Sequence, residues 1–98
     1  MIYNTNIYET NFKKEAEIFK ALSNPVRLEV LECLFDGEKC VCEIISKLNK
    51  YEQAHISKSL IKLKQAGILK DRKEGLNVYY SIAMPCIIHF ISCLKTNM

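Results

Sequence analysis

The sequence predicts a mainly α-helical domain that carries one small β-hairpin. Apolar residues recur at helical spacing through most of residues 11–66. After Gly67 the apolar period changes to the alternation of two short strands, and a last segment then returns to helical spacing. We therefore expect one domain over residues 11–98, preceded by a flexible polar arm of residues 1–10.

The first two predicted helices meet at a proline boundary. Residues 11–22 have one apolar helical face, which is made by Phe12, Ala16, Phe19 and Leu22. Asn24 can cap a second helix, and Pro25 suits its first position, since the N–H that proline lacks has no helical partner there. Gly37 ends this helix, because glycine accepts the left-handed conformation that often follows a helix.

A short helix over residues 41–48 and a longer one over residues 52–66 follow, joined by a tight connection. In the longer helix, Ile56, Leu60 and Leu63 lie at i, i+4 and i+7, which predicts an inward apolar stripe. The opposite face is polar.

Residues 68–73 and 76–82 are predicted as two strands, with a turn at Glu74-Gly75. The last helix begins near Pro85 and is apolar around most of its circumference. A helix of that kind is buried, and pairing with a second chain is the simplest way to bury it.

The charge distribution favours a nucleic-acid surface. The net charge is +3, but residues 50–73 hold seven basic against two acidic side chains, whereas residues 1–49 hold six basic against eight acidic. Such a split is typical of a chain that binds nucleic acid, although a solvated helix face gives the same pattern.

The sequence also predicts where the protein resides. It has no apolar run long enough to span a membrane, and residues 1–4 lack the pattern of a signal peptide. Five cysteines, an odd number, argue against a disulfide framework. We expect a cytoplasmic protein with reduced thiols and no membrane partner.

Helices, a tight helix pair and a basic hairpin in this order describe a winged helix-turn-helix. The residues resemble a known family, the arsenic- and metal-responsive ArsR/SmtB repressors, over roughly residues 15–94. The segments that carry the resemblance are 21–28 (second helix), 38–43 (metal box), 53–60 (recognition helix), and 66–69 and 71–80 (helix end and wing). The resemblance implies a homodimer built on the first and last helices. It also implies that the dimer represses by binding an operator, and that a bound inducer lowers its affinity for DNA.

A recognition helix places side chains near its N-terminus against base edges, while flanking residues contact phosphates. Glutamine can contact adenine, and lysine can reach guanine. The candidate DNA-binding residues are Gln53, His55, Ser57, Lys58, Ser59, Lys62 and, at the hairpin tip, Arg72 and Lys73. Alternatively, Gln53 and Ser57 are only surface or cap residues, and His55 is a surface group or a stray metal ligand.

Cys40 and Cys42 are the first candidate metal ligands. Both lie at a predicted helix N-terminus, where the helix dipole and Lys39 favour thiolate. Residues two apart do not share a helix face, so the sulfurs converge only if Cys40 lies in the irregular first turn. Arsenite takes three sulfurs, and zinc, cadmium and lead prefer three or four ligands, so the pair is one ligand short.

Cys86 and Cys93 are candidates for the remaining ligand. The family's third cysteine is absent after the pair, where Ile44 and Ile45 stand. Cys86 and Cys93 lie on one helix face but about 10.5 Å apart along the axis, so they cannot share one ion. Our hypothesis is a composite site of Cys40, Cys42 and one of these two. Free cysteine often acts as a small apolar residue, which is favoured for Cys33 and equally plausible for Cys86 and Cys93.

These observations predict a transcriptional repressor whose inducer is a thiol-bound ion, arsenite first and cadmium, lead or zinc after it. The alternative is a repressor of the same fold that senses oxidants or persulfides through its cysteines. A third possibility is a DNA-binding module without an inducer. No glycine-rich phosphate loop, Cys-x-x-Cys motif or hydrolytic constellation is present, so we expect neither an enzyme nor an organic cofactor.

Overall fold

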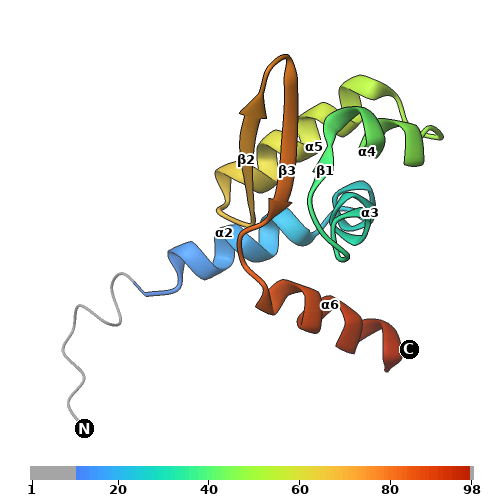
Figure 1. Cartoon of the computed structure of the whole chain (residues 1–98). Coiled ribbons are helices and arrows are strands. Elements are labelled where there is room, and N and C mark those ends of the chain that lie inside the picture. Colours follow the sequence, from blue (N-terminus) through green and yellow to red (C-terminus); the bar gives the residue numbers. More distant parts are fainter. Residues whose placement is uncertain (1–10, 98) are drawn as a thin grey trace, which may run out of the picture.

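The computed structural model describes residues 11–97, so the predicted arm of residues 1–10 lies outside the described residues. The elements are α2 (Lys13–Leu22), α3 (Pro25–Cys33), β1 (Lys39–Cys40), α4 (Val41–Lys47), α5 (Gln53–Gln65), β2 (Leu69–Glu74), β3 (Asn77–Ile82) and α6 (Cys86–Thr96). In Figure 1, the β2–β3 hairpin projects from the body made by α3, α4 and α5, and α6 lies on the opposite side of the molecule. This is the predicted winged helix-turn-helix, and no described helix has the length and apolar character needed to cross a membrane.

The predicted start of α3 is confirmed, but its predicted end is not. The Asn24 side chain accepts hydrogen bonds from the amides of Val26 and Arg27 at 2.9 and 3.2 Å and so caps α3. The sequence placed the end of this helix at Gly37, whereas α3 ends at Cys33 with Leu34 as its C-cap. Gly37 lies in the turn that follows, with φ of +136°, a conformation that disfavours any residue with a Cβ.

The sheet contains one strand that the sequence did not reveal. The strand order is β1-β3-β2, and β1 pairs antiparallel with β3 through Lys39 opposite Tyr80 and Cys40 opposite Tyr79. Two residues are too few to show alternation, so no period could predict β1. The strand fixes Cys40 to the base of the wing immediately before α4 begins.

The core holds α4 and α5 against α3 and the base of the sheet. Its fully buried side chains include Val30, Leu31, Ile44, Ile56 and Ile68, each 0% exposed. They come from α3, α4, α5 and the segment before β2, so all these elements share one core. The relative placement of α4 and α5 therefore depends on close packing, which tolerates little movement.

Helix α6 docks by one face only. Ile87 and Ile91 are buried, the ring of Phe90 packs edge-on against Phe19 of α2 at 5.9 Å, and Lys95 pairs with Glu32 of α3. A single chain therefore does not cover the whole helix, as its apolar circumference predicted, and burial of the other face by a second chain stays a prediction. Large apolar side chains of α2 and α6 remain exposed: Phe12 at 74%, Phe19 at 57%, Phe90 at 41% and Leu94 at 53%.

Candidate nucleic-acid interface and thiol pair

Helix α5 has a polar face opposite its buried stripe. Ile56, Leu60 and Leu63 are at most 1% exposed and face the core, as the helical period predicts. The exposed candidates for DNA contact on the other side are Gln53, His55, Lys58 and Lys62, and Ser57 beside them is half-buried. A rigid core thus supports a helix whose outward side chains are mostly polar or cationic.

Ser59 does not lie with these residues. It is only 3% exposed, and its hydroxyl donates a hydrogen bond of 2.9 Å to the backbone carbonyl of His55. It follows Ile56 by three residues and precedes Leu63 by four, so it lies beside both on the buried side of the helix. The prediction that Ser59 faces DNA is therefore not supported by its position, and we leave it out of the proposed contacts.

Arg72 is held in the middle of the wing, opposite Tyr79, by two carboxylates. Its guanidinium donates two hydrogen bonds of 2.8 Å to Glu38 and one of 2.6 Å to Glu74, and it stacks 4.6 Å from the ring centre of Tyr79. These hydrogen bonds, that with Glu38 first, raise the pKa of Arg72, and the bond from Arg72 lowers the pKa of Glu38. Arg72 therefore braces the wing against the segment before β1.

The tip of the wing lies beyond both predicted basic residues. The strand register continues to Glu74 opposite Asn77, so Gly75, with φ of +63°, and Leu76 make the turn. Placing Arg72 and Lys73 at the tip is thus wrong, because Lys73 lies one strand pair and Arg72 two strand pairs before the last pair of the hairpin. Lys73 is exposed near the tip, whereas Leu76 at the tip is fully exposed and apolar.

A polar cluster fixes the turn that precedes α5. The Tyr51 hydroxyl donates a hydrogen bond to the Glu29 carboxylate, and Lys50 pairs with the same carboxylate at 3.0 Å. The bond from Tyr51, followed by that from Lys50, lowers the pKa of Glu29. The Tyr51 ring also packs edge-on against His55 of α5. The sequence gives no sign of this cluster, because Glu29 and Tyr51 are far apart in the chain and belong to no common pattern.

Cys40 and Cys42 converge in the way the sequence analysis required. Cys40 is the N-cap of α4, with extended φ and ψ of −68° and 148°, and its sulfur accepts from the Cys42 amide at 3.4 Å. Because Cys40 lies outside the helical spiral, its sulfur comes within 2.6 Å of the Cys42 sulfur. Glu43 completes a capping box by accepting from the Cys40 amide at 3.1 Å. The Cys40 side chain is buried and that of Cys42 is exposed.

The two thiols have opposite pKa shifts. The pKa of Cys40 is lowered, first because the Cys42 thiol donates to its sulfur and then because the Cys42 amide does so. The pKa of Cys42 is raised, first because that hydrogen bond favours its protonated form and then by burial. These shifts make Cys40, at the N-terminus of α4, the first of the two thiols to lose its proton.

The other cysteines lie elsewhere. Cys86 and Cys93 are exposed on α6, and within residues 11–97 no three His, Cys, Asp or Glu side chains gather into a group that could hold a metal ion. A composite site of Cys40, Cys42 and an α6 cysteine is thus not assembled within one chain. Cys33 is half-buried against the core, and burial raises its pKa, which agrees with the apolar role expected for it.

Comparison with known proteins gives the same fold and adds a family. Residues 24–71 match the family model described as bacterial regulatory protein, arsR family. An uncharacterized HTH-type transcriptional regulator of Methanocaldococcus jannaschii is 51% identical over 73 residues, which cover 72% of this chain and 81% of that protein.

Two further similar proteins are a homodimeric DNA-binding domain and an arsenical resistance repressor. The solution structure of the homodimeric winged helix-turn-helix DNA-binding domain of Mb0332 from Mycobacterium bovis is 27% identical, with a TM-score of 0.81 over 98% of this chain and 88% of that one. The arsenical resistance operon repressor of Escherichia coli is 35% identical over 74 residues, which cover 74% of this chain but 62% of that protein.

Proposed function

We infer a metal(loid)-responsive repressor from one premise: this chain belongs to the ArsR/SmtB family of transcriptional regulators, which are DNA-binding proteins and not enzymes. On that basis the chain is a repressor that binds an operator in the apo state and releases it when an ion binds sulfur. The observation that carries this proposal is the thiol pair at the N-terminus of α4, one helix before the reader helix α5.

Helix α5 is the element that enters the major groove. Gln53, Ser57 and Lys58 near its N-terminus read base edges, with His55 beside them, because this end of a recognition helix approaches the bases. Lys62, one turn further on, and Lys73 in the wing contact phosphates. Arg72 can contact the DNA backbone only if a phosphate replaces Glu38 or Glu74 as a partner of its guanidinium. The Tyr51–Glu29 contact keeps the turn before α5 fixed on α3.

The DNA-binding unit is a homodimer. The exposed aromatic side chains of α2 and α6 leave an apolar surface that a second copy would cover, and the similar Mycobacterium bovis domain is homodimeric. Pairing through these helices sets the distance between the two copies of α5. A dimer of this kind binds two half-sites about one helical turn of DNA apart.

The inducer is a thiophilic ion, with arsenite first and cadmium, lead or zinc after it. Cys40 and Cys42 present two sulfurs on one side of the N-terminus of α4, and the lowered pKa of Cys40 favours its thiolate, the form that binds soft ions. The third ligand is one cysteine of α6, Cys86 or Cys93, contributed by the second copy, because one chain does not bring it to the pair. The name of the Escherichia coli relative is in accord with arsenite.

Ion binding would act on DNA through α4. Ligation draws Cys40 and Cys42 toward the ion and removes the capping hydrogen bonds that start α4. Because α4 packs on both α5 and β3, a shift of its first turn changes how the reader helix and the wing are held. The operator affinity then falls because the two reader helices no longer fit neighbouring grooves.

The direct test is operator release on the intact protein. The apo dimer first selects a high-affinity duplex from a random pool, and binding is then measured under strict reduction with and without arsenite. We expect weaker binding with the ion in the wild type and in Cys33→Ser, and no weakening in Cys40→Ser or Cys42→Ser. Loss of the response in Cys86→Ser or Cys93→Ser, but not in both, identifies the third ligand.

A redox repressor is the second candidate, and the short distance between the two sulfurs favours it. A hydroperoxide would oxidise the two thiols to one disulfide and be reduced to an alcohol and water, with the Cys40 thiolate as the attacking group. Release of DNA by hydroperoxide, reversed by dithiothreitol, without any response to ions under reduction, would favour this candidate over the first.

A further inference from the structure

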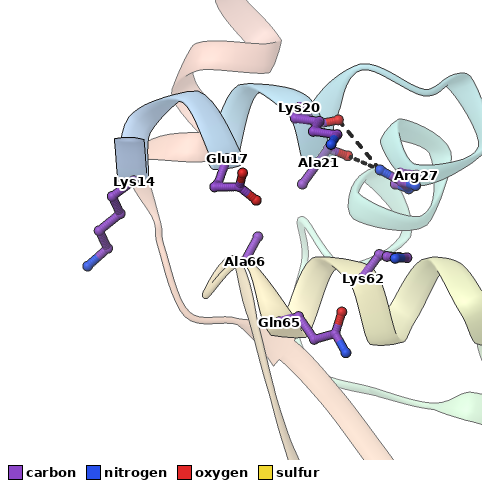
Figure 2. A pocket seen from close by; sticks show the side chains of 8 residues that line it. All are labelled: Lys14, Glu17, Lys20, Ala21, Arg27, Lys62, Gln65 and Ala66. Atoms are coloured by element: carbon purple, nitrogen blue, oxygen red, sulfur yellow. Dashed lines mark hydrogen bonds between the residues drawn. The ribbon is translucent and has the colours of Figure 1, made fainter. Parts of the chain in front are cut away.

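A cationic pocket lies beside the reader helix, outside the residues assigned above except for Lys62. It has a volume of about 380 Å³ and is formed by α2, the N-terminal part of α3 and the C-terminal half of α5. Its charged lining consists of four cationic side chains, Lys14, Lys20, Arg27 and Lys62, and one carboxylate, Glu17. Figure 2 shows Lys14 at one end, Arg27 and Lys62 at the other, and Glu17 between them.

The cations of this pocket have no ion-pair partner within residues 11–97. Among the described residues, none of its four cations forms an ion pair with a carboxylate, whereas Lys50, Lys64 and Arg72 on nearby elements each do. Cations that gather without a partner repel one another, so an anion that enters the pocket removes an unfavourable interaction as well as making favourable ones.

Arg27 is already positioned for such a ligand. Its guanidinium donates to the backbone carbonyl of Ala21 at 3.2 Å and to that of Lys20 at 3.5 Å, two carbonyl groups at the C-terminal end of α2 (Figure 2). These bonds use one of its terminal nitrogens, Nη1, and leave the other donors of the guanidinium for a ligand. Holding the side chain in advance lowers the entropy cost of binding.

The lining indicates which kind of anion fits. The apolar part consists of Ala21 and Ala66, which is too small to bury the body of an organic molecule. The ligand is therefore a small, highly charged group such as phosphate. Lys62 belongs both to the pocket and to the polar face of α5, so the pocket continues the surface that we assign to DNA.

We propose that this pocket binds a backbone phosphate of the operator and so anchors α2 and α3 on the DNA next to the groove that α5 reads. This inference rests on the proposed function, because it requires that the chain bind duplex DNA. A backbone contact fixes the register of the protein on the duplex without reading sequence. Substitutions in the pocket should therefore weaken binding to selected and unrelated duplexes by the same factor.

The experiment compares two substitutions in the pocket with two matched controls on the same helix. Lys20→Gln and Glu17→Gln change the charge of the pocket, while Lys13→Gln and Glu15→Gln make the same chemical changes at exposed α2 residues that do not line it. All four side chains are exposed, and thermal unfolding of each variant verifies the fold. The readout is DNA affinity measured across a range of salt concentrations, on the selected duplex and on an unrelated one.

For Lys20→Gln we expect weaker binding to both duplexes, and a slope of log affinity against log salt that falls by about 0.9 for one lost phosphate contact. Glu17→Gln should tighten binding to both, since it removes repulsion of the phosphate. Lys13→Gln and Glu15→Gln should change the affinity less than their partners and leave the slope near that of the wild type.

Two results would overturn the inference while leaving the proposed function intact: Lys20→Gln matching Lys13→Gln in slope and affinity, or Lys20→Gln weakening only the selected duplex. A third such result would come from a titration of the DNA-free protein with inorganic phosphate, monitored by NMR. Saturable phosphate binding to the pocket with an unchanged DNA slope in Lys20→Gln would assign the pocket to a free anion instead. If the wild type bound no duplex DNA, the proposed function and this inference would fail together.

Discussion

The opposite pKa shifts of Cys40 and Cys42 lead to a quantitative prediction for metal binding. At pH values between the lowered pKa of Cys40 and the raised pKa of Cys42, the pair holds one proton. A cadmium ion that binds both sulfurs as thiolates releases that proton. Within this window, release of the proton should therefore raise the logarithm of the cadmium association constant by about 1 for each pH unit.

The two single substitutions should differ in the slope of the logarithm of the cadmium association constant against pH. Cys42→Ser removes the thiol that holds the proton, while the serine hydroxyl and the residue 42 amide still donate to Cys40, so the slope should fall by about 1. Cys40→Ser removes the thiolate and leaves a protonated Cys42, so the slope should stay near that of the wild type. Both variants bind cadmium more weakly. Protons released by any further ligand are common to the three proteins and cancel in the comparison.

The assay is a competition titration of cadmium against a chelator of known affinity, repeated at intervals downward from pH 9.0, the ordinary thiol value, which lies between the lowered pKa of Cys40 and the raised pKa of Cys42. Cys33→Ser is the control, and its slope should equal that of the wild type. Equal slopes in the wild type and Cys42→Ser would refute the assignment of the proton to Cys42. A slope that fell only in Cys40→Ser would reverse the roles of the two thiols.

Three other predictions follow from the packing and the interface. Ile44→Ala, in a fully buried position of α4, should lower the free energy of unfolding by about 2–5 kcal/mol in a denaturant titration, and a loss below about 1 kcal/mol would contradict the core described here. Lys58→Ala should weaken DNA binding in a fluorescence-anisotropy titration, whereas Ser59→Ala, whose hydroxyl is bonded within α5, should leave DNA affinity near that of the wild type; equal losses would show that α5 is rotated from its position here. Phe90→Glu should shift sedimentation velocity toward the monomer, while Leu76→Glu at the exposed wing tip should not, and a stable Phe90→Glu dimer would rule out α6 as the dimer surface.

The fold followed from the sequence wherever a local signal was strong. The Asn24-Pro25 start of α3, the apolar stripe of α5 and the period change after Gly67 each identify an element by their own residues. The features that could not be predicted depend on contacts between distant segments. Strand β1 exists because Lys39 and Cys40 meet β3, and two residues show no period of their own.

The candidate site likewise has features that local sequence predicts and features that depend on contacts between distant residues. The sequence predicted that Cys40 and Cys42 converge only if Cys40 lies in the irregular first turn, because residues two apart do not share a helix face. The structure places Cys40 just before that turn, at the N-cap of α4. The Arg72–Glu38 pair and the Tyr51–Glu29 contact were not predictable, since each joins residues that lie far apart in the chain. The burial of Ser59 at the edge of a stripe was missed because one residue at such an edge can face either side.

The central claim is that binding of an ion at Cys40 and Cys42 lowers the affinity of the dimer for DNA. The decisive measurement is the affinity of the reduced dimer for its selected duplex, with and without a saturating thiophilic ion, in the wild type and in Cys40→Ser. We predict that the ion weakens binding by about 5- to 150-fold in the wild type, the usual range for coupled sites, and leaves Cys40→Ser unchanged. Equal DNA affinity of the wild type with and without saturating arsenite and cadmium would contradict the account.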